Sequence, residues 1–153
     1  MIPPAPDPST TLVLRRTFTA SRQRVFRAWI SPVALEHWLR PRGMSVTVSQ
    51  LEARVGGSFR FEVEDGGSIV GTYLHIVPPE KLVFTWSGEG MQGRETIVTL
   101  DFLDQGPVTE VVLTHERIST PEMRAMFGSG WQSMLDTLAE ILSTRLNDDA
   151  LSR

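Results

Sequence analysis

The 153-residue sequence contains no cysteine, one lysine and one tyrosine. The absence of cysteine excludes disulfide bonds, thiolate metal ligands and a cysteine nucleophile. It is also typical of a reducing compartment, so we expect a cytoplasmic protein. No apolar run approaches the roughly 18 residues of a membrane-spanning helix, so no membrane partner is expected. Residues 1–8 hold four prolines and no basic region, which does not fit a signal peptide.

Charge is distributed unevenly along the chain. Residues 1–60 hold nine arginines and three acidic residues, whereas residues 61–153 hold six basic and fifteen acidic residues. Because the net charge is −3, and nucleic-acid-binding domains are usually strongly basic, no nucleic-acid partner is expected. We interpret the basic half as solvated surface, although complementary halves could also pair in a homodimer. The near-absence of lysine is typical of a GC-rich bacterial genome.

The length and composition fit one globular domain, with 41% hydrophobic and 22% charged residues. We place this domain at residues 10–146. A disordered proline-rich leader over 1–9 should precede it, and a frayed tail over 147–153 should follow.

The hydrophobic pattern predicts a first strand over 10–19, two short helices, and then a long region of period two. The short helices should begin after Ser21 and Ser31, because serine caps a helix N-terminus and Pro32 suits the first helical position. Turn signals divide the period-two region into predicted strands at 45–53, 57–64, 68–77, 81–87, 94–103 and 108–117. Short connections favour antiparallel pairing, so we predict an α+β fold.

A long amphipathic helix should end the chain, beginning after Thr120 with Pro121 and Glu122 in its first turn. Gly128 and Gly130 weaken its helix propensity and indicate a kink or a close approach to the sheet. Apolar residues recur at intervals of three and four: Met123, Met126, Phe127, Trp131, Met134, Leu135, Leu138, Ile141 and Leu142. This stripe needs a large apolar partner, and one face of the sheet is the available one.

Several stretches also resemble a known family. Residues 18–38 contain the pattern F-T-A-S-R-x-x-V-F-x-A-W-I-S-P-x-x-L-x-x-W, and residues 55–59, 71–86, 109–115 and 130–135 add further matches. The pattern resembles the START-like, birch-pollen-allergen-like (SRPBCC) superfamily, and within it the family named after activators of the heat-shock-protein-90 ATPase. The resemblance implies a helix-grip fold: a seven-stranded curved antiparallel sheet around a long C-terminal helix, with two short helices after the first strand. Because this superfamily contains lipid carriers, hormone receptors and polyketide cyclases, it implies no single activity.

A curved sheet cannot contact a straight helix along its whole length, so we expect an internal cavity between the two. A pocket lined by aromatic and aliphatic groups is typical of small-molecule sites. Simple packing against the last helix is the alternative for each residue alone. The expected lining is Trp38, Phe59, Phe61, Tyr73, Phe84, Trp86, Val98, Leu100, Leu113, His115, Met123, Phe127, Trp131 and Met134.

Two polar residues are weak catalytic candidates. His115 shares a strand face with apolar residues and could act as a general acid or base, or could be a buried structural histidine. Tyr73 and His75 alternate on one strand and could line the cavity together or face solvent. The three histidines fall on separate predicted elements, so we expect no metal and no cofactor. A Ser-His-Asp triad stays open, but no G-x-S-x-G motif marks its serine.

These observations favour a domain that binds a small apolar ligand, either lipid-like or aromatic. An enzyme of the cyclase or dehydratase kind, using His115 or Tyr73, is one alternative. A protein-interaction domain resembling a chaperone activator is another.

Overall fold

A computed structural model describes residues 9–88, 91 and 93–143. Residues 1–8 of the expected leader, and the expected tail, lie outside the described residues. The elements in chain order are β1 (Leu12–Phe18), α1 (Arg22–Ala28), α2 (Pro32–Trp38), the 3-10 helix η1 (Pro41–Gly43), β2 (Val46–Leu51), β3 (Ser58–Val63), β4 (Ser68–Val77), β5 (Lys81–Trp86), β6 (Thr96–Gln105), β7 (Val108–Glu116) and α3 (Pro121–Leu142).

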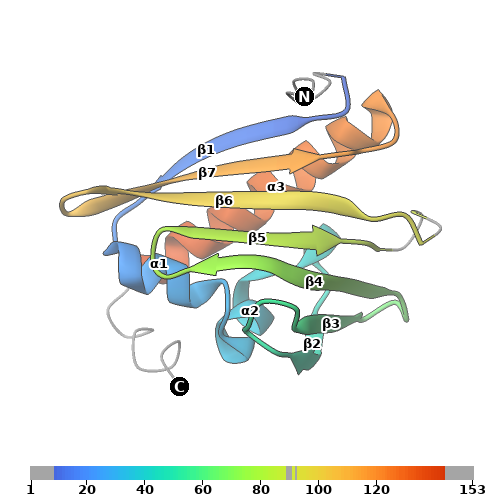
Figure 1. Cartoon of the computed structure of the whole chain (residues 1–153), viewed down its shortest axis with the longest axis horizontal. Coiled ribbons are helices and arrows are strands. Elements are labelled where there is room, and N and C mark those ends of the chain that lie inside the picture. The colour runs from blue at the N-terminus through green and yellow to red at the C-terminus, as the bar shows by residue number, and fades with distance from the viewer. Residues whose placement is uncertain (1–8, 89–90, 92, 144–153) are drawn as a thin grey trace.

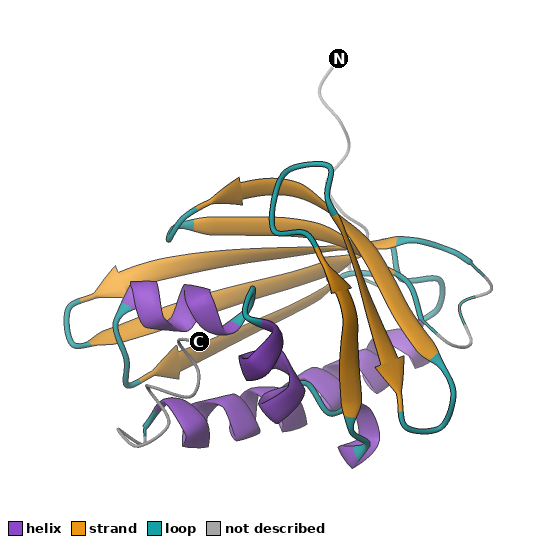
Figure 2. Cartoon of the chain, turned by 90° about the horizontal axis from the view of Figure 1, so that it is seen from below, coloured by secondary structure: helices purple, strands orange, loops and turns teal. Residues whose placement is uncertain are grey.

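The strands form one seven-stranded sheet in the order β1-β7-β6-β5-β4-β3-β2 (Figure 1). Each neighbouring pair is antiparallel. The sheet bends over α3, and α1 and α2 lie near one end of that helix (Figure 2). The predicted α+β helix-grip architecture is confirmed.

Three side-chain caps fix where the helices begin. The hydroxyls of Ser21, Ser31 and Thr120 accept a hydrogen bond from the backbone N–H three residues further on, at 3.3, 3.2 and 3.1 Å. Each cap satisfies a helix donor that would otherwise lack a partner, and is typically worth about 1 kcal/mol. All three were predicted from the sequence.

One strand lies two residues later than the sequence predicts. We expected a strand over 94–103, whereas β6 covers Thr96–Gln105. Gln105 pairs with Val108 across a two-residue turn, so the ladder continues to the end of the hairpin. At the other end Thr96 pairs with Trp86, the last residue of β5. Arg94 therefore lies in the loop before β6.

The core forms between the concave face of the sheet and α3. The predicted helix stripe is buried at Trp131, Met134, Leu135, Leu138 and Leu142. On the sheet, alternate residues of β6 and β7 are buried, as period-two patterning requires. Met126 differs from the prediction and is 55% exposed. It lies at the edge of the stripe and lines a groove between α3 and the β3–β4 hairpin.

Part of the charge asymmetry is balanced within the chain. On β1, Arg15 pairs with Glu110 of β7, and Arg16 pairs with Asp136 of α3. The basic N-terminal half thus contacts the acidic C-terminal half intramolecularly. Because these pairs are largely exposed, each contributes about 0–1 kcal/mol to stability.

Candidate functional site

Aromatic rings almost fill the concave face of the sheet where α1 and α2 cover it. Phe59 and Phe61 stack with their centroids 4.8 Å apart, and Trp86 lies 5.1 Å from Trp131. The remaining void measures about 10 Å³, close to the space of one water molecule. It is lined by Trp29, Leu35, Leu39, Phe59, Phe61, Tyr73, Phe84 and Trp86. A ligand larger than a few atoms therefore has no room here.

A much larger space opens beside α3, and we call it the α3 groove. Its volume is about 390 Å³, within the usual range of small-molecule sites. One wall is α3, and the other is formed by the β3–β4 hairpin, the end of β5 and η1. The lining residues are Pro41, Arg42, Val63, Gly67, Ser68, Ile69, Trp86, Gly88, Met91, Met126, Phe127, Gly130, Trp131 and Met134. Most of these side chains are apolar.

The two glycines of α3 have different surroundings. A Cβ built on Gly130 would meet no atom within 4 Å, because this position faces the groove. A Cβ built on Gly128 would lie 3.4 Å from Leu12 Cδ1, because this position faces β1. The missing side chain at Gly130 therefore keeps the groove wide, whereas a methyl group at Gly128 would make ordinary contact with Leu12.

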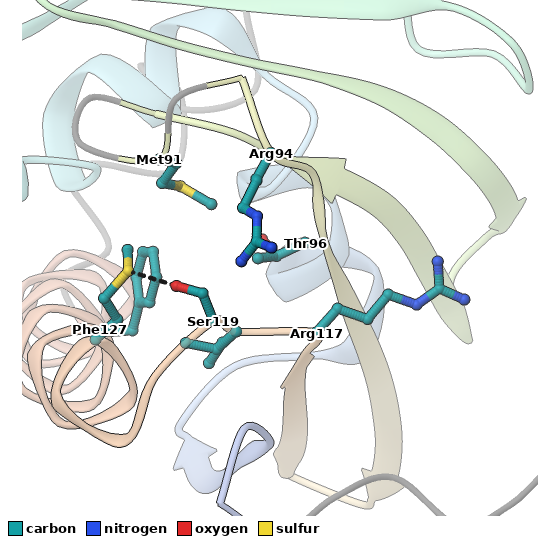
Figure 3. Close-up of a pocket in the computed structure, with 8 residues that line it drawn as sticks. Met91, Arg94, Thr96, Arg117, Ser119 and Phe127 are labelled. Carbon is teal, nitrogen blue, oxygen red and sulfur yellow. Dashed lines mark hydrogen bonds between the residues drawn. The ribbon is translucent and has the colours of Figure 1, made fainter.

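A second space, the arginine pocket, lies at the N-terminal end of α3 (Figure 3). Its volume is about 320 Å³, and its lining is Met91, Arg94, Thr96, Arg117, Ile118, Ser119, Met123 and Phe127. Met91 and Phe127 also line the α3 groove, so the two spaces adjoin.

A chain of buried hydrogen bonds supports the wall of the groove. The indole N–H of Trp131 donates to Nδ1 of His115 at 3.1 Å, and Nε2 of His115 lies 2.7 Å from Oγ1 of Thr96. The Thr96 hydroxyl donates in turn to the carbonyl oxygen of Trp86 at 2.7 Å. Because an indole nitrogen can only donate, Nδ1 must accept, and we assign the ring proton of neutral His115 to Nε2. Every polar group in this chain thus has a partner.

His115 is therefore placed as a structural residue. Its side chain is 0% exposed, and both ring nitrogens are occupied. Burial lowers the pKa of His115 to about 3, since the charged form would lose its hydration. The neutral ring holds the indole of Trp131, which lines the groove, but has no nitrogen free for a ligand.

This burial predicts a pH-dependent stability. Unfolded His115 should titrate near pH 6.5, whereas the folded ring stays neutral until about pH 3. The contribution of His115 is fully present above pH 6.5 and is lost as the pH falls toward 3. The expected slope from this residue is at most about 1.4 kcal/mol per pH unit. Urea denaturation at pH 7 and at pH 5 measures this change in the free energy of unfolding.

The matched control is His115→Gln, which keeps a donor and an acceptor but does not titrate. We expect this variant to be less stable at pH 7 and to show a smaller loss between pH 7 and pH 5. An equal loss in both proteins would show that His115 does not carry the effect.

Tyr73 and His75 are separated by a β-bulge. The register of β4 against β5 shifts between them, because Tyr73 pairs with Phe84 while His75 pairs with the adjacent residue, Val83. Tyr73 is consequently buried and His75 is exposed. Burial raises the pKa of the Tyr73 hydroxyl, which keeps it protonated. Tyr73 lines the small void and His115 lines none of the three spaces, so the two catalytic candidates do not share a cavity.

The residues expected to line a cavity divide into four groups. Trp86, Phe127, Trp131 and Met134 line the α3 groove. Met123 and Phe127 line the arginine pocket, while Phe59, Phe61, Tyr73, Phe84 and Trp86 surround the small void. The others, Trp38, Val98, Leu100, Leu113 and His115, are buried and line none of the three spaces.

Sequence reasoning missed the groove residues outside the regular stripe. Arg42, Ile69 and Gly130 line the groove, and Arg94 and Ser119 line the arginine pocket. Gly130 lies on the same helix as Trp131 and Met134 and has no side chain. This interruption of the apolar stripe could have suggested an open space beside the helix. No pattern marked Arg94, which lies in a loop.

Within the described ranges, no three histidine, aspartate or glutamate side chains gather as metal ligands would. No helix in the same part of the chain is both long and apolar enough to cross a bilayer.

Several proteins of known sequence or structure are similar to this chain. Activator of 90 kDa heat shock protein ATPase homolog 1 from Homo sapiens is 25% identical over 126 residues, which are 82% of this chain and 34% of that protein. The chain thus spans about a third of the length of the curated relatives it matches.

Solved structures show the same fold. Protein CV1439 from Chromobacterium violaceum is 29% identical with a TM-score of 0.78, covering 88% of this chain and 98% of that one. DynU16, a protein of the dynemicin biosynthetic locus, is 22% identical with a TM-score of 0.76, covering 91% of this chain and 48% of that one. A family model described as "Activator of Hsp90 ATPase homolog 1-like protein" matches residues 19–143. The chain therefore belongs to the Activator of Hsp90 ATPase homolog 1-like protein family.

Proposed function

We propose that the chain binds a small apolar ligand, lipid-like or aromatic, in the α3 groove. The observation that carries this proposal is an open space of about 390 Å³ with mainly apolar walls. Each 100 Å² of apolar ligand surface buried there would contribute roughly 2.5 kcal/mol before the entropy of association is subtracted. The groove lies between α3 and the β3–β5 part of the sheet, whereas the space between the sheet and the short helices is nearly filled by rings.

The composition of the walls supports a ligand of variable shape. Met91, Met126 and Met134 line the groove together with the indole rings of Trp86 and Trp131. Methionine has a flexible, polarisable side chain that adapts to irregular apolar surfaces. The Trp131 indole is held by its hydrogen bond to His115, and the backbone carbonyl of Trp86 accepts a hydrogen bond from Thr96. Rigid rings together with adaptable methionines suit apolar molecules of more than one outline.

The positions of the two candidate catalytic side chains, His115 and Tyr73, favour binding over catalysis. General acid–base catalysis needs a group within hydrogen-bond reach of the substrate. Both ring nitrogens of His115 are occupied, and Tyr73 lines a void of about 10 Å³. The activator role named for the human relative belongs to a protein of which this chain covers 34%, and no contact here favours it.

A neutral fluorescent probe tests the proposal. N-Phenylnaphthylamine is weakly fluorescent in water and brighter in an apolar site, so titration with the protein should give a saturable rise at one probe per chain. Lipid-like and aromatic compounds should then displace it competitively. A rise that never saturates, or no rise at all, would contradict binding in the groove.

A further inference from the structure

The arginine pocket has an unbalanced positive charge. Its described lining contains two arginines and no carboxylate. Elsewhere Arg15, Arg16, Arg42, Arg54 and Arg60 each pair with an acidic side chain. The guanidinium of Arg94 has no ion pair or hydrogen bond with any residue in the described part of the chain. An anion in this pocket would therefore meet a cation whose donors have no partner among the described residues.

Arg94 is also oriented toward the pocket. Its backbone N–H donates to the carbonyl oxygen of Met91 at 2.9 Å, which fixes the start of its side chain. In Figure 3 the guanidinium points toward Thr96 and Ser119, while the side chain of Arg117 extends away from the pocket. We therefore assign the charge inside the pocket to Arg94.

A second donor lies opposite Arg94. The hydroxyl of Ser119 donates to the thioether sulfur of Met123 at 3.0 Å. A thioether is a weak acceptor, so a charged oxygen would readily replace it. Thr96 cannot serve in the same way, because its hydroxyl already donates to the carbonyl oxygen of Trp86.

Arg117 shapes this corner through its backbone. It adopts a left-handed conformation with φ of 66°, which is unfavourable for a residue other than glycine. The conformation turns the chain from β7 toward Ser119 and the start of α3. The positive end of the helix dipole lies at this start and also favours an anion.

The pocket adjoins the apolar groove. Met91 and Phe127 line both spaces, so the two lie side by side. The other arginine on the groove, Arg42, pairs with Asp65 at 3.2 Å, so its charge is already balanced. The acid group of a bound molecule would thus be drawn to the Arg94 end.

From this geometry we infer that the ligand is an amphipathic carboxylic acid. Its carboxylate binds the guanidinium of Arg94 and the hydroxyl of Ser119, and its apolar part lies along the α3 groove. The planar guanidinium suits a carboxylate because it can offer two parallel N–H donors. This inference rests on the proposed function, since it names the chemical class of the ligand for the same groove.

Competition against N-phenylnaphthylamine tests the inference with matched acids and alcohols. Decanoate is compared with decanol for a lipid-like ligand, and naphthoate with naphthol for an aromatic one. In at least one pair the acid should displace the probe at a concentration about tenfold lower than the alcohol, as expected for a hydrogen bond to a charged group. The pair in which the acid is preferred shows whether the bound carboxylate belongs to a lipid-like or to an aromatic molecule.

Arg94→Gln should reduce this preference to about twofold or less, because the ratio of acid to alcohol potency within one protein isolates the contribution of the charge. The matched control is Arg27→Gln, which removes one exposed positive charge from α1, away from both spaces, and should keep the full preference.

Two results would overturn the inference: acid and alcohol of equal potency in both pairs, or a preference that survives in Arg94→Gln. Failure of the probe itself to bind the wild-type protein would instead count against the proposed function. The acids and alcohols would then be compared by the shift in melting temperature they cause, with the same variants and the same criteria.

Discussion

Replacement of Gly71 by alanine is expected to destabilise the fold by about 3 kcal/mol or more, the upper end for an overpacked site. A Cβ at this position in β4 would lie 2.1 Å from the carbonyl oxygen of Thr85 and 2.3 Å from Cζ of Phe59. The Thr85 carbonyl belongs to the backbone of β5, and Phe59 is wedged among other aromatic rings. Neither neighbour can move without breaking other contacts.

Urea denaturation of the purified variant measures this loss. The control is Gly130→Ala, whose new Cβ meets no atom within 4 Å. In the helix interior this change should stabilise the protein by up to about 1 kcal/mol, because alanine favours helix more than glycine does. Gly71→Ala should thus lower the free energy of unfolding, whereas Gly130→Ala should raise it. A Gly71→Ala protein as stable as the wild type would contradict the close approach of β4 and β5.

Filling the groove from α3 is expected to abolish most ligand binding without unfolding the protein. Gly130→Leu places an apolar side chain in the space between the helix and the β3–β4 hairpin, where a Cβ finds no neighbour. We expect at least a tenfold loss of N-phenylnaphthylamine affinity, equal to about 1.4 kcal/mol. Stability should be unchanged or higher, since leucine is a good helix former. Fluorescence titration and thermal denaturation measure the two effects.

Two controls separate occupation of the groove from general effects on α3. Gly130→Ala adds one methyl group to the same position and should reduce affinity much less than leucine. Gly128→Ala changes a glycine that faces Leu12, so its effect should fall on stability and not on binding. Unchanged affinity in Gly130→Leu would place the bound probe elsewhere.

Most of the fold could be predicted because it depends on local patterns. The caps at Ser21, Ser31 and Thr120 mark helix starts by a hydrogen bond that spans three residues. The alternation of buried residues along β6 and β7 follows from strand geometry. These signals need no knowledge of distant contacts.

Where along the sheet and α3 the space stays open could not be predicted in this way. Alternation places Phe59, Phe61 and Trp86 on the inner face but does not show how closely their rings fill it. The bulge that separates Tyr73 from His75 depends on pairing with β5 and leaves no clear mark in the sequence. Arg94 was expected inside a strand, so its approach to the pocket was not foreseen.

The indole N–H signals of the four tryptophans test ligand binding in the α3 groove most directly. Trp86 and Trp131 line the groove, whereas the N–H of buried Trp38 donates to the carbonyl oxygen of Ala28 at 3.0 Å, away from it. In a nitrogen-15 correlation spectrum titrated with N-phenylnaphthylamine, the Trp86 and Trp131 signals should shift saturably while that of Trp38 stays in place. Unmoved Trp86 and Trp131 signals, or equal shifts of all four indoles, would contradict a ligand site beside α3.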